Sequence, residues 1–251
     1  MALTNLQIAF GVGLFVFNAI ILQWFIARIK GGKKPYIRKM QGLVGIEEAA
    51  GRCAEMGQRF AANCSGALTG SQSHTVAAGY GILGYAMRAC ARTGAEPLVP
   101  FYGSAEVLPM YYNIIEQAYA QEGQSEAYRP EYVEQIALSY ASNFTYLGAV
   151  AAMLERSNIG ATLWLGQVAS VNAVVAEVDG ISIQGTGYLS NIMITGLLCD
   201  YSFIGEELFA ASAMISENPM MAASIQGMDL DKYITLGMLI LMVPLVAVGL
   251  L

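Results

Sequence analysis

Residues that bind metals or perform acid–base chemistry near neutral pH are scarce in this chain. It contains one histidine, His74, and four cysteines that stand far apart and form no C-x-x-C pair. Zinc and iron–sulfur sites need such ligands at short spacing, so we expect no metal ion and no cofactor. We interpret the cysteines as small, apolar, buried side chains.

The sequence also lacks the short motifs that mark the common nucleotide-dependent and hydrolytic enzymes. No G-x-G-x-x-G follows a predicted strand, no G-x-x-x-x-G-K-[ST] is present, and there is no G-x-S-x-G. The nearest resemblance to a phosphate-binding loop, the stretch GALTGSQS, has no lysine. Nothing in the sequence therefore indicates a particular class of enzyme; we favour a protein that is not an enzyme and keep an enzyme as the alternative.

Charge is sparse, at 13% of residues, and it is divided unevenly along the chain. Residues 45–232 hold all nineteen acidic residues and only seven of the thirteen basic ones. A segment with such an excess of negative charge is repelled by phosphate backbones, so we expect no nucleic-acid partner.

Two long apolar runs without ionisable side chains stand near the ends of the chain, at 8–26 and 233–251. Each run is long enough for a transmembrane helix, so we predict an N-terminal span within 1–27 and a C-terminal span at 233–251. Small or polar positions that would shape helix packing in these spans are Gly11, Gly13, Asn18 and Pro244.

A basic linker, residues 28–44, follows the first run. Basic residues beside a span favour the cytoplasmic side, which predicts a two-pass protein of the cell membrane with a cytoplasmic domain at 45–232 and both termini outside. The same side chains would contact anionic lipid headgroups, although a topology signal alone explains them as well. They are Arg28, Lys30, Lys33, Lys34, Arg38 and Lys39.

The central region alternates short apolar segments with amphipathic ones. We predict an α/β fold with a parallel sheet of about six short strands, helices on both faces, and the two transmembrane helices as flanks. The strands are expected near 60–64, 97–102, 132–140, 161–165, 180–184 and 196–201. Their order in the sheet does not follow from one sequence.

Ligands of such sheets bind beyond the carboxyl ends of the strands. Glycine recurs in those segments, for example at Gly66 and Gly166, although tight turns alone account for it. His74 is either a base oriented by a nearby carboxylate or a residue that caps a helix. The predicted ligand-binding residues are Gly70, Ser71, His74, Glu106, Asn143, Gln167, Gly185, Asp200 and Glu206.

Two stretches, GIEEAAGRCAEMGQ (45–58) and CDYSFIGEELFAASAMIS (199–216), carry a resemblance. With the terminal apolar runs they make the chain similar to an uncharacterised family of prokaryotic membrane proteins, a domain of unknown function. Cys53 stands where that family more usually has a smaller residue. The resemblance covers nearly the whole chain and implies a bacterial or archaeal source, but no activity.

Two functions are therefore expected as alternatives. The first is a self-assembling scaffold or structural subunit of a membrane complex, with a homo-oligomer and other membrane subunits as partners; small-residue helix surfaces favour it. The second is a nucleotide- or metabolite-binding protein, or an enzyme, that uses the strand ends. A transporter is a third hypothesis with less support, because two transmembrane helices per chain form a translocation pathway only in an oligomer.

Overall fold

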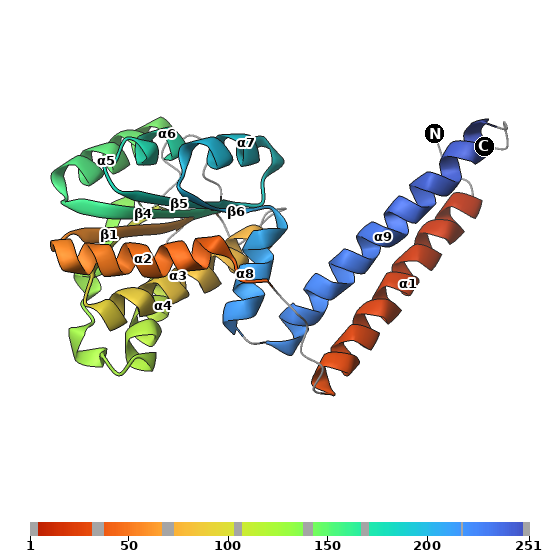
Figure 1. The fold of residues 1–251 in the computed structure, drawn as a ribbon, viewed down its shortest axis with the longest axis horizontal. Helices are drawn as coiled ribbons and strands as arrows, with labels where there is room; N and C mark the ends of the chain where they lie inside the picture. Colours follow the sequence, from red (N-terminus) through yellow and green to blue (C-terminus); the bar gives the residue numbers. More distant parts are fainter. Residues whose placement is uncertain are drawn as a thin grey trace. The chain divides into compact units, whose positions relative to one another are not determined.

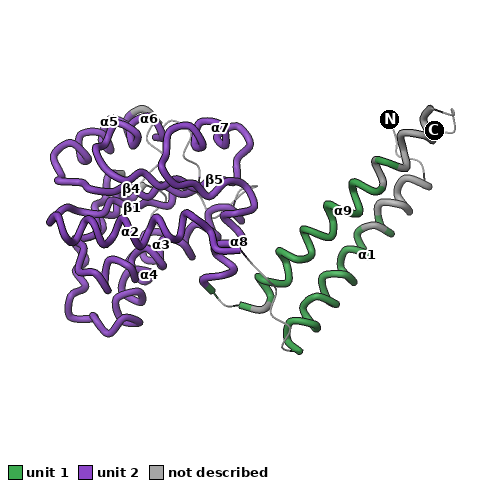
Figure 2. Tube along the Cα trace, viewed as in Figure 1, with its two compact units in different colours: residues 1–37, 216–251 green, residues 38–215 purple. Residues whose placement is uncertain are grey.

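The computed structural model describes the chain except residues 1–4, 32–37, 67–72, 103–106, 138–142, 167–170, 217 and 248–251. The chain divides into two compact units (Figure 2). Arg38–Ile215 form one unit, which contains the sheet. Met1–Ile37 and Ser216–Leu251 form the other, so that both ends of the chain belong to a single unit.

A six-stranded parallel sheet forms the centre of the larger unit, which confirms the predicted α/β class. Its strands are short and largely buried, as expected for a sheet covered on both faces. In spatial order they run β3-β2-β1-β4-β5-β6. Their bounds are β1 Arg59–Ser65, β2 Glu96–Tyr102, β3 Val133–Ala137, β4 Ile159–Gly166, β5 Ile181–Thr186 and β6 Tyr201–Ile204.

Helices cover both faces of this sheet (Figure 1). Helices α2 (Gln41–Met56), α3 (Ser73–Thr93) and α4 (Leu108–Gln121) lie on one face. Helices α5 (Asn143–Arg156), α6 (Val171–Ala176) and α7 (Leu189–Leu198) lie on the other. Two short 3₁₀ turns, Ser125–Ala127 and Pro130–Tyr132, precede β3, and α8 (Glu206–Ser216) follows β6.

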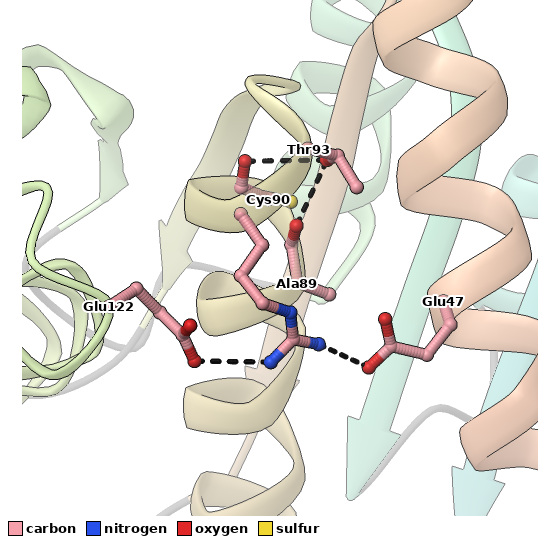
Figure 3. Close-up of polar contacts among 6 residues, drawn as sticks. Glu47, Ala89, Cys90, Thr93 and Glu122 are labelled. Atoms are coloured by element: carbon pink, nitrogen blue, oxygen red, sulfur yellow. Dashed lines mark hydrogen bonds and ion pairs between the residues drawn. The ribbon is translucent and has the colours of Figure 1, made fainter.

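Arg92, near the end of α3, joins the three helices of the first face. Its guanidinium donates to Glu47 of α2 and, at 3.1 Å, to Glu122 just after α4 (Figure 3). In the next residue, the Thr93 hydroxyl donates to the Ala89 carbonyl of the same helix at 2.9 Å. Of these two residues, Arg92 is the one that fixes α3 against its neighbours.

The sixth strand lies later in the chain than the sequence suggests. Residues 196–201 were expected to be extended, but Leu189–Leu198 form α7 and the strand begins at Tyr201. Within α7 the polar side chains of Asn191 and Thr195 are buried while several apolar ones are exposed. An apolar run normally indicates a buried segment, and here most of the apolar side chains are exposed, so the sequence wrongly predicted a buried strand.

The smaller unit consists of α1 (Asn5–Lys30) and α9 (Pro219–Ala247), which pack against each other. A Cβ atom at Gly227 of α9 would lie 3.5 Å from the Leu22 side chain of α1. Gly13 has open space around it, and Asn18 is half-buried. Gly11 and Pro244 lie within α1 and α9, but their surroundings fall outside the described residues.

The predicted transmembrane helices at 1–27 and 233–251 are wrong. Within the described part of the chain, no helix is both long and apolar enough to cross a bilayer. The apolar runs belong to longer helices that also carry charge: α1 continues through Arg28 and Lys30, and α9 contains Asp229 and Asp231. The predicted two-pass location in the cell membrane, with a cytoplasmic domain and outer termini, is wrong with them.

Candidate ligand site at the crossover of the sheet

The order of the strands reverses between β1 and β4. From β1 the chain moves outward through β2 to β3, and it then returns to the other side of β1 and moves outward again through β4, β5 and β6. Helix α3, which follows β1, and helix α6, which follows β4, lie on opposite faces (Figure 1). Segments that leave adjacent strand ends toward opposite faces open a crevice, which is where doubly wound sheets bind ligands.

Both strands end at this crossover in glycines with positive φ. Gly66 follows β1 with φ 136°, and Gly166 ends β4 with φ 90°. A Cβ atom at Gly166 would lie 2.3 Å from the carbonyl oxygen of Ser65, its partner in the sheet. A Cβ atom at Gly66 would lie 2.6 Å from the Val76 side chain. The backbone at the crossover therefore requires glycine at both positions.

Helix α3 packs unusually close to the same two strands. A Cβ atom at Gly79 would lie 2.5 Å from Sγ of Cys64 in β1 and 3.4 Å from Cβ of Leu165 in β4. At the start of the helix, buried Thr75 lies beside Gly187, just after β5. The first turn of α3 is thereby held at the carboxyl edge of the sheet, and the N–H groups of a helix start favour anionic or polar ligand atoms.

A buried polar network closes the gap that opens where β1 and β2 separate. The register between these strands ends at Ala61 and Leu98. Beyond it the Tyr111 hydroxyl of α4 donates to the Cys64 carbonyl and lies 3.0 Å from Oδ1 of Asn63. Burial raises the pKa of Tyr111 well above its usual value, so the hydroxyl stays protonated and able to donate.

Asn63 extends this network to the opposite face, because its Nδ2 donates to the Tyr146 hydroxyl of α5 at 2.7 Å. In the register of the sheet Asn63 pairs with Trp164, and Trp164 pairs with Gln184. All three side chains are fully buried. Sequence reasoning placed these residues in or beside strands but assigned them no role; the signal for them was a polar residue inside a short apolar strand.

The predicted ligand residue His74 lies in the first turn of α3, where it is exposed and stacks on Phe209 of α8, with ring centroids 5.7 Å apart. Asp200 lies immediately before β6, and its carboxylate accepts from the backbone N–H (2.8 Å) and hydroxyl (3.1 Å) of Ser182 near the start of β5. The structure thus ties Asp200 to the amino end of β5 rather than to His74.

The other predicted ligand residues are dispersed. Gly185 lies inside β5, where a Cβ atom would be 2.7 Å from the Leu165 side chain, so it serves packing between the sheet and its helices. Glu206 is exposed at the start of α8, and Asn143 begins α5. Gly70, Ser71, Glu106 and Gln167 lie outside the described residues. A ligand-binding role for these residues stays a prediction.

The basic residues that were predicted to contact lipid headgroups have mixed surroundings. Arg28 lies over the Trp24 ring, with Cζ 5.2 Å from its centroid, and Arg38 forms an ion pair with Glu207. Lys30 and Lys39 are exposed, whereas Lys33 and Lys34 lie outside the described residues.

Two open clefts occur at the amino ends of strands, away from the crossover edge. One, of about 610 Å³, lies near Gln58 and Asn158, which precede β1 and β4. The other, of about 500 Å³, lies near Gly94 and Arg129, beside the start of β2. Among the described residues, no group of three or more histidine, cysteine or acidic side chains is placed to hold a metal ion.

Comparison with known proteins gives one result. Residues 2–250 match the profile of a protein family described as "Domain of unknown function (DUF6754)". No curated protein and no solved structure matches the chain. The match agrees with the uncharacterised family expected from the sequence over nearly its whole length, and it carries no activity with it.

Proposed function

The chain belongs to the DUF6754 family, and we propose that it is a small-ligand-binding protein whose α/β unit takes a nucleotide or a similar polar metabolite at the crossover between β1 and β4. The observation that carries this proposal is the reversal of strand order at a point where Gly66 and Gly166 end adjacent strands. Sheets of this order place their ligand in that crevice.

The chemistry of the described rim favours binding by neutral groups. Ser65, Thr75 and Thr186 contribute hydroxyls there, and Gly66 and Gly166 add no side chain. None of these five residues is charged, so a phosphate or carboxylate would be held by N–H groups at the start of α3. The proposal is therefore binding rather than catalysis.

Two threonines at opposite ends of α3 provide a matched test. Thr75 lies at the proposed site, whereas the Thr93 hydroxyl donates only to its own helix, at Ala89 and Cys90. Thr75→Val and Thr93→Val make the same chemical change. Calorimetric titration and thermal unfolding with adenine and guanine nucleotides, NAD⁺ and acidic metabolites provide the readout.

We expect at least one ligand to raise the melting temperature of the wild-type chain and to bind Thr75→Val at least tenfold more weakly. Its affinity for Thr93→Val should equal that of the wild type. Two outcomes overturn the proposal: no ligand binds at millimolar concentration, or a bound ligand loses the same affinity in both variants.

A second candidate function is self-assembly through the smaller unit, and a separate observation favours it. Large apolar side chains are exposed on both of its helices, including Phe15 (74%) and Ile20 (62%) on α1 and Leu236 (54%) and Ile240 (63%) on α9. Exposed large apolar side chains in this number on one helix pair mark an interaction surface. We propose that a second copy of the same helix pair covers it.

Native mass measurement of the full chain tests this assembly. The wild type should be oligomeric, and the double change Phe15→Glu with Ile20→Glu should give a monomer. Val44→Glu, at an exposed apolar position (48%) of α2, is the control and should leave the oligomer intact. A monomeric wild type contradicts self-assembly, as does a chain that floats with lipid vesicles instead of associating with itself.

A further inference from the structure

The face of the sheet beneath α6 and α7 contains buried polar atoms without partners. Trp164 of β4 and Gln184 of β5 are adjacent in register and have no exposed surface. Within the part of the chain that the structure describes, the indole Nε1 of Trp164 and both Oε1 and Nε2 of Gln184 form no hydrogen bond. In Asn172 of α6, which is also fully buried, Oδ1 is unpartnered.

The side-chain directions place the first two residues together. Gly185, the next residue after Gln184, faces Leu208 of α8, so Gln184 faces the opposite side, toward α6 and α7. Trp164 belongs to the same hydrophobic cluster as Val171 and Val175 of α6, which places it on that same side. Both polar side chains therefore lie next to each other on the face of the sheet that α6 and α7 cover.

A polar contact joins α6 to α7. Nδ2 of Asn172 donates to Oγ1 of Thr195 in α7 at 3.2 Å, which leaves the amide oxygen of Asn172 free. Neither α6 nor α7 contains a charged residue. Together the three side chains offer two unpaired donors, in Trp164 and Gln184, and two unpaired acceptors, in Gln184 and Asn172, and none of them is charged.

Buried polar atoms are almost always paired in proteins, and those that are not call for a ligand, water or ion. A side-chain amide with both groups free, beside a free indole N–H, is complementary to a flat neutral group that has a donor and an acceptor on one edge. Amides and nucleobases have such an edge. Charged groups do not suit these atoms, because none of the three side chains carries an opposite charge.

Trp164 lies close to the crossover in the register of the sheet. Trp164 pairs with Asn63 of β1, and two residues further on, Ser65 pairs with Gly166 at the strand ends. Two residues of strand correspond to about 7 Å. We infer that Trp164, Gln184 and Asn172 bind the uncharged amide or nucleobase portion of the ligand; this rests on the proposed function, in which the rest of the ligand lies at the crossover.

The test removes the polar atoms without changing the shape of the side chain. Gln184→Met keeps the length of the side chain and deletes both unpaired groups, and Asn172→Leu is a second variant at the cover. Gln135→Met is the control, because Gln135 is an exposed amide whose Nε2 donates to Tyr112. The probes are nicotinamide, adenine and uracil alone, and the whole nucleotide that the wild type binds.

We expect Gln184→Met to raise the melting temperature of the ligand-free protein, because two unpaired polar atoms leave the core. It should also bind the nucleotide and its isolated base or amide at least tenfold more weakly, as should Asn172→Leu, while Gln135→Met matches the wild type. The inference is overturned if Gln184→Met and Asn172→Leu bind the probes as the wild type does, or if Gln184→Met melts lower without ligand. Nucleotide binding unchanged in both variants overturns this inference alone, whereas a wild type that binds no nucleotide overturns the proposed function.

Discussion

The hydroxyl of Tyr111 donates to the carbonyl oxygen of Cys64 at the point where β2 leaves β1. A helix side chain thus replaces the neighbouring strand as partner for the end of β1. The same hydroxyl lies 3.0 Å from Oδ1 of Asn63, so one phenol serves two buried groups next to the crossover. The shape of the candidate site therefore depends on a residue of α4, the helix that follows β2 in the sequence.

Replacement of Tyr111 by phenylalanine should destabilise the fold by about 1–3 kcal/mol, because a buried carbonyl and amide lose their partner. Denaturant unfolding measures this loss. Tyr112→Phe is the control: its hydroxyl only accepts from Gln135 at 3.2 Å on a more exposed surface, and its effect should stay within about 0.5 kcal/mol. Equal losses in both variants would show that the Tyr111–Cys64 contact contributes no stability.

Alanine at Gly166 should be far more costly than alanine at Gly94. Both glycines have positive φ, 90° and 80°, so alanine suffers similar backbone strain of about 1–2 kcal/mol at each. A Cβ atom at Gly94 meets nothing within 4 Å, whereas at Gly166 it would lie 2.3 Å from the Ser65 carbonyl oxygen. The two variants therefore differ in unfolding free energy by the steric cost of a side chain at Gly166. A difference near zero would mean that the crossover backbone is not as tight as described.

The link from α3 to α2 and α4 should contribute modestly to stability and should depend on salt. Arg92→Met removes the ion pairs with Glu47 and Glu122, and because the arginine side chain is 41% exposed we expect a loss of about 1 kcal/mol. Arg88→Met, which removes a cation–π contact to Tyr85, should lower the free energy of unfolding by about 0.5 kcal/mol. In 1 M NaCl the gap between the variants should shrink; a gap that is independent of salt contradicts an ionic contribution.

The four thiols should be poorly reactive in the native protein. Burial raises the pKa of Cys53 and of Cys199 to about 11, and it raises the pKa of Cys64 and Cys90 further still. The reactive species is the thiolate, so a raised pKa leaves only about one Cys199 in a thousand reactive at pH 8.

Mass-spectrometric labelling with iodoacetamide checks this ordering. Labelling of Cys199, the one partly exposed thiol of the four, should rise about tenfold per pH unit from pH 8 to 10. Cys64 and Cys90 should react only after unfolding. A plateau of the Cys199 rate near pH 9, the value for a free thiol, would contradict burial of that side chain.

Five of the six strands were predictable because each is a short apolar run bounded by glycine, proline or polar turns. The sixth failed because α7 exposes Leu189 and Leu197 while it buries Asn191 and Thr195, the reverse of the usual pattern. The prediction for the apolar runs near the two ends was wrong for a different reason. Composition flagged them as transmembrane spans, whereas the helices that contain them extend into charged sequence at Arg28 and Asp231.

The candidate site was predictable only in outline. Ligands were expected beyond strand ends, and glycines at Gly66 and Gly166 were noted there, but the crossover depends on strand order, which arises from long-range packing. Trp164 and Gln184 became significant only when their register pairing was known. No local pattern shows that two residues twenty positions apart in sequence lie side by side without hydrogen-bond partners.

Amide NMR shifts during titration with the ligand that stabilises the chain most show whether the α/β unit binds its ligand at the β1–β4 crossover. We expect the largest changes on the backbone N–H groups of Gly66, Gly166 and Gly187. Largest changes near Gln58 and Asn158, at the cleft beside the opposite ends of β1 and β4, would contradict it.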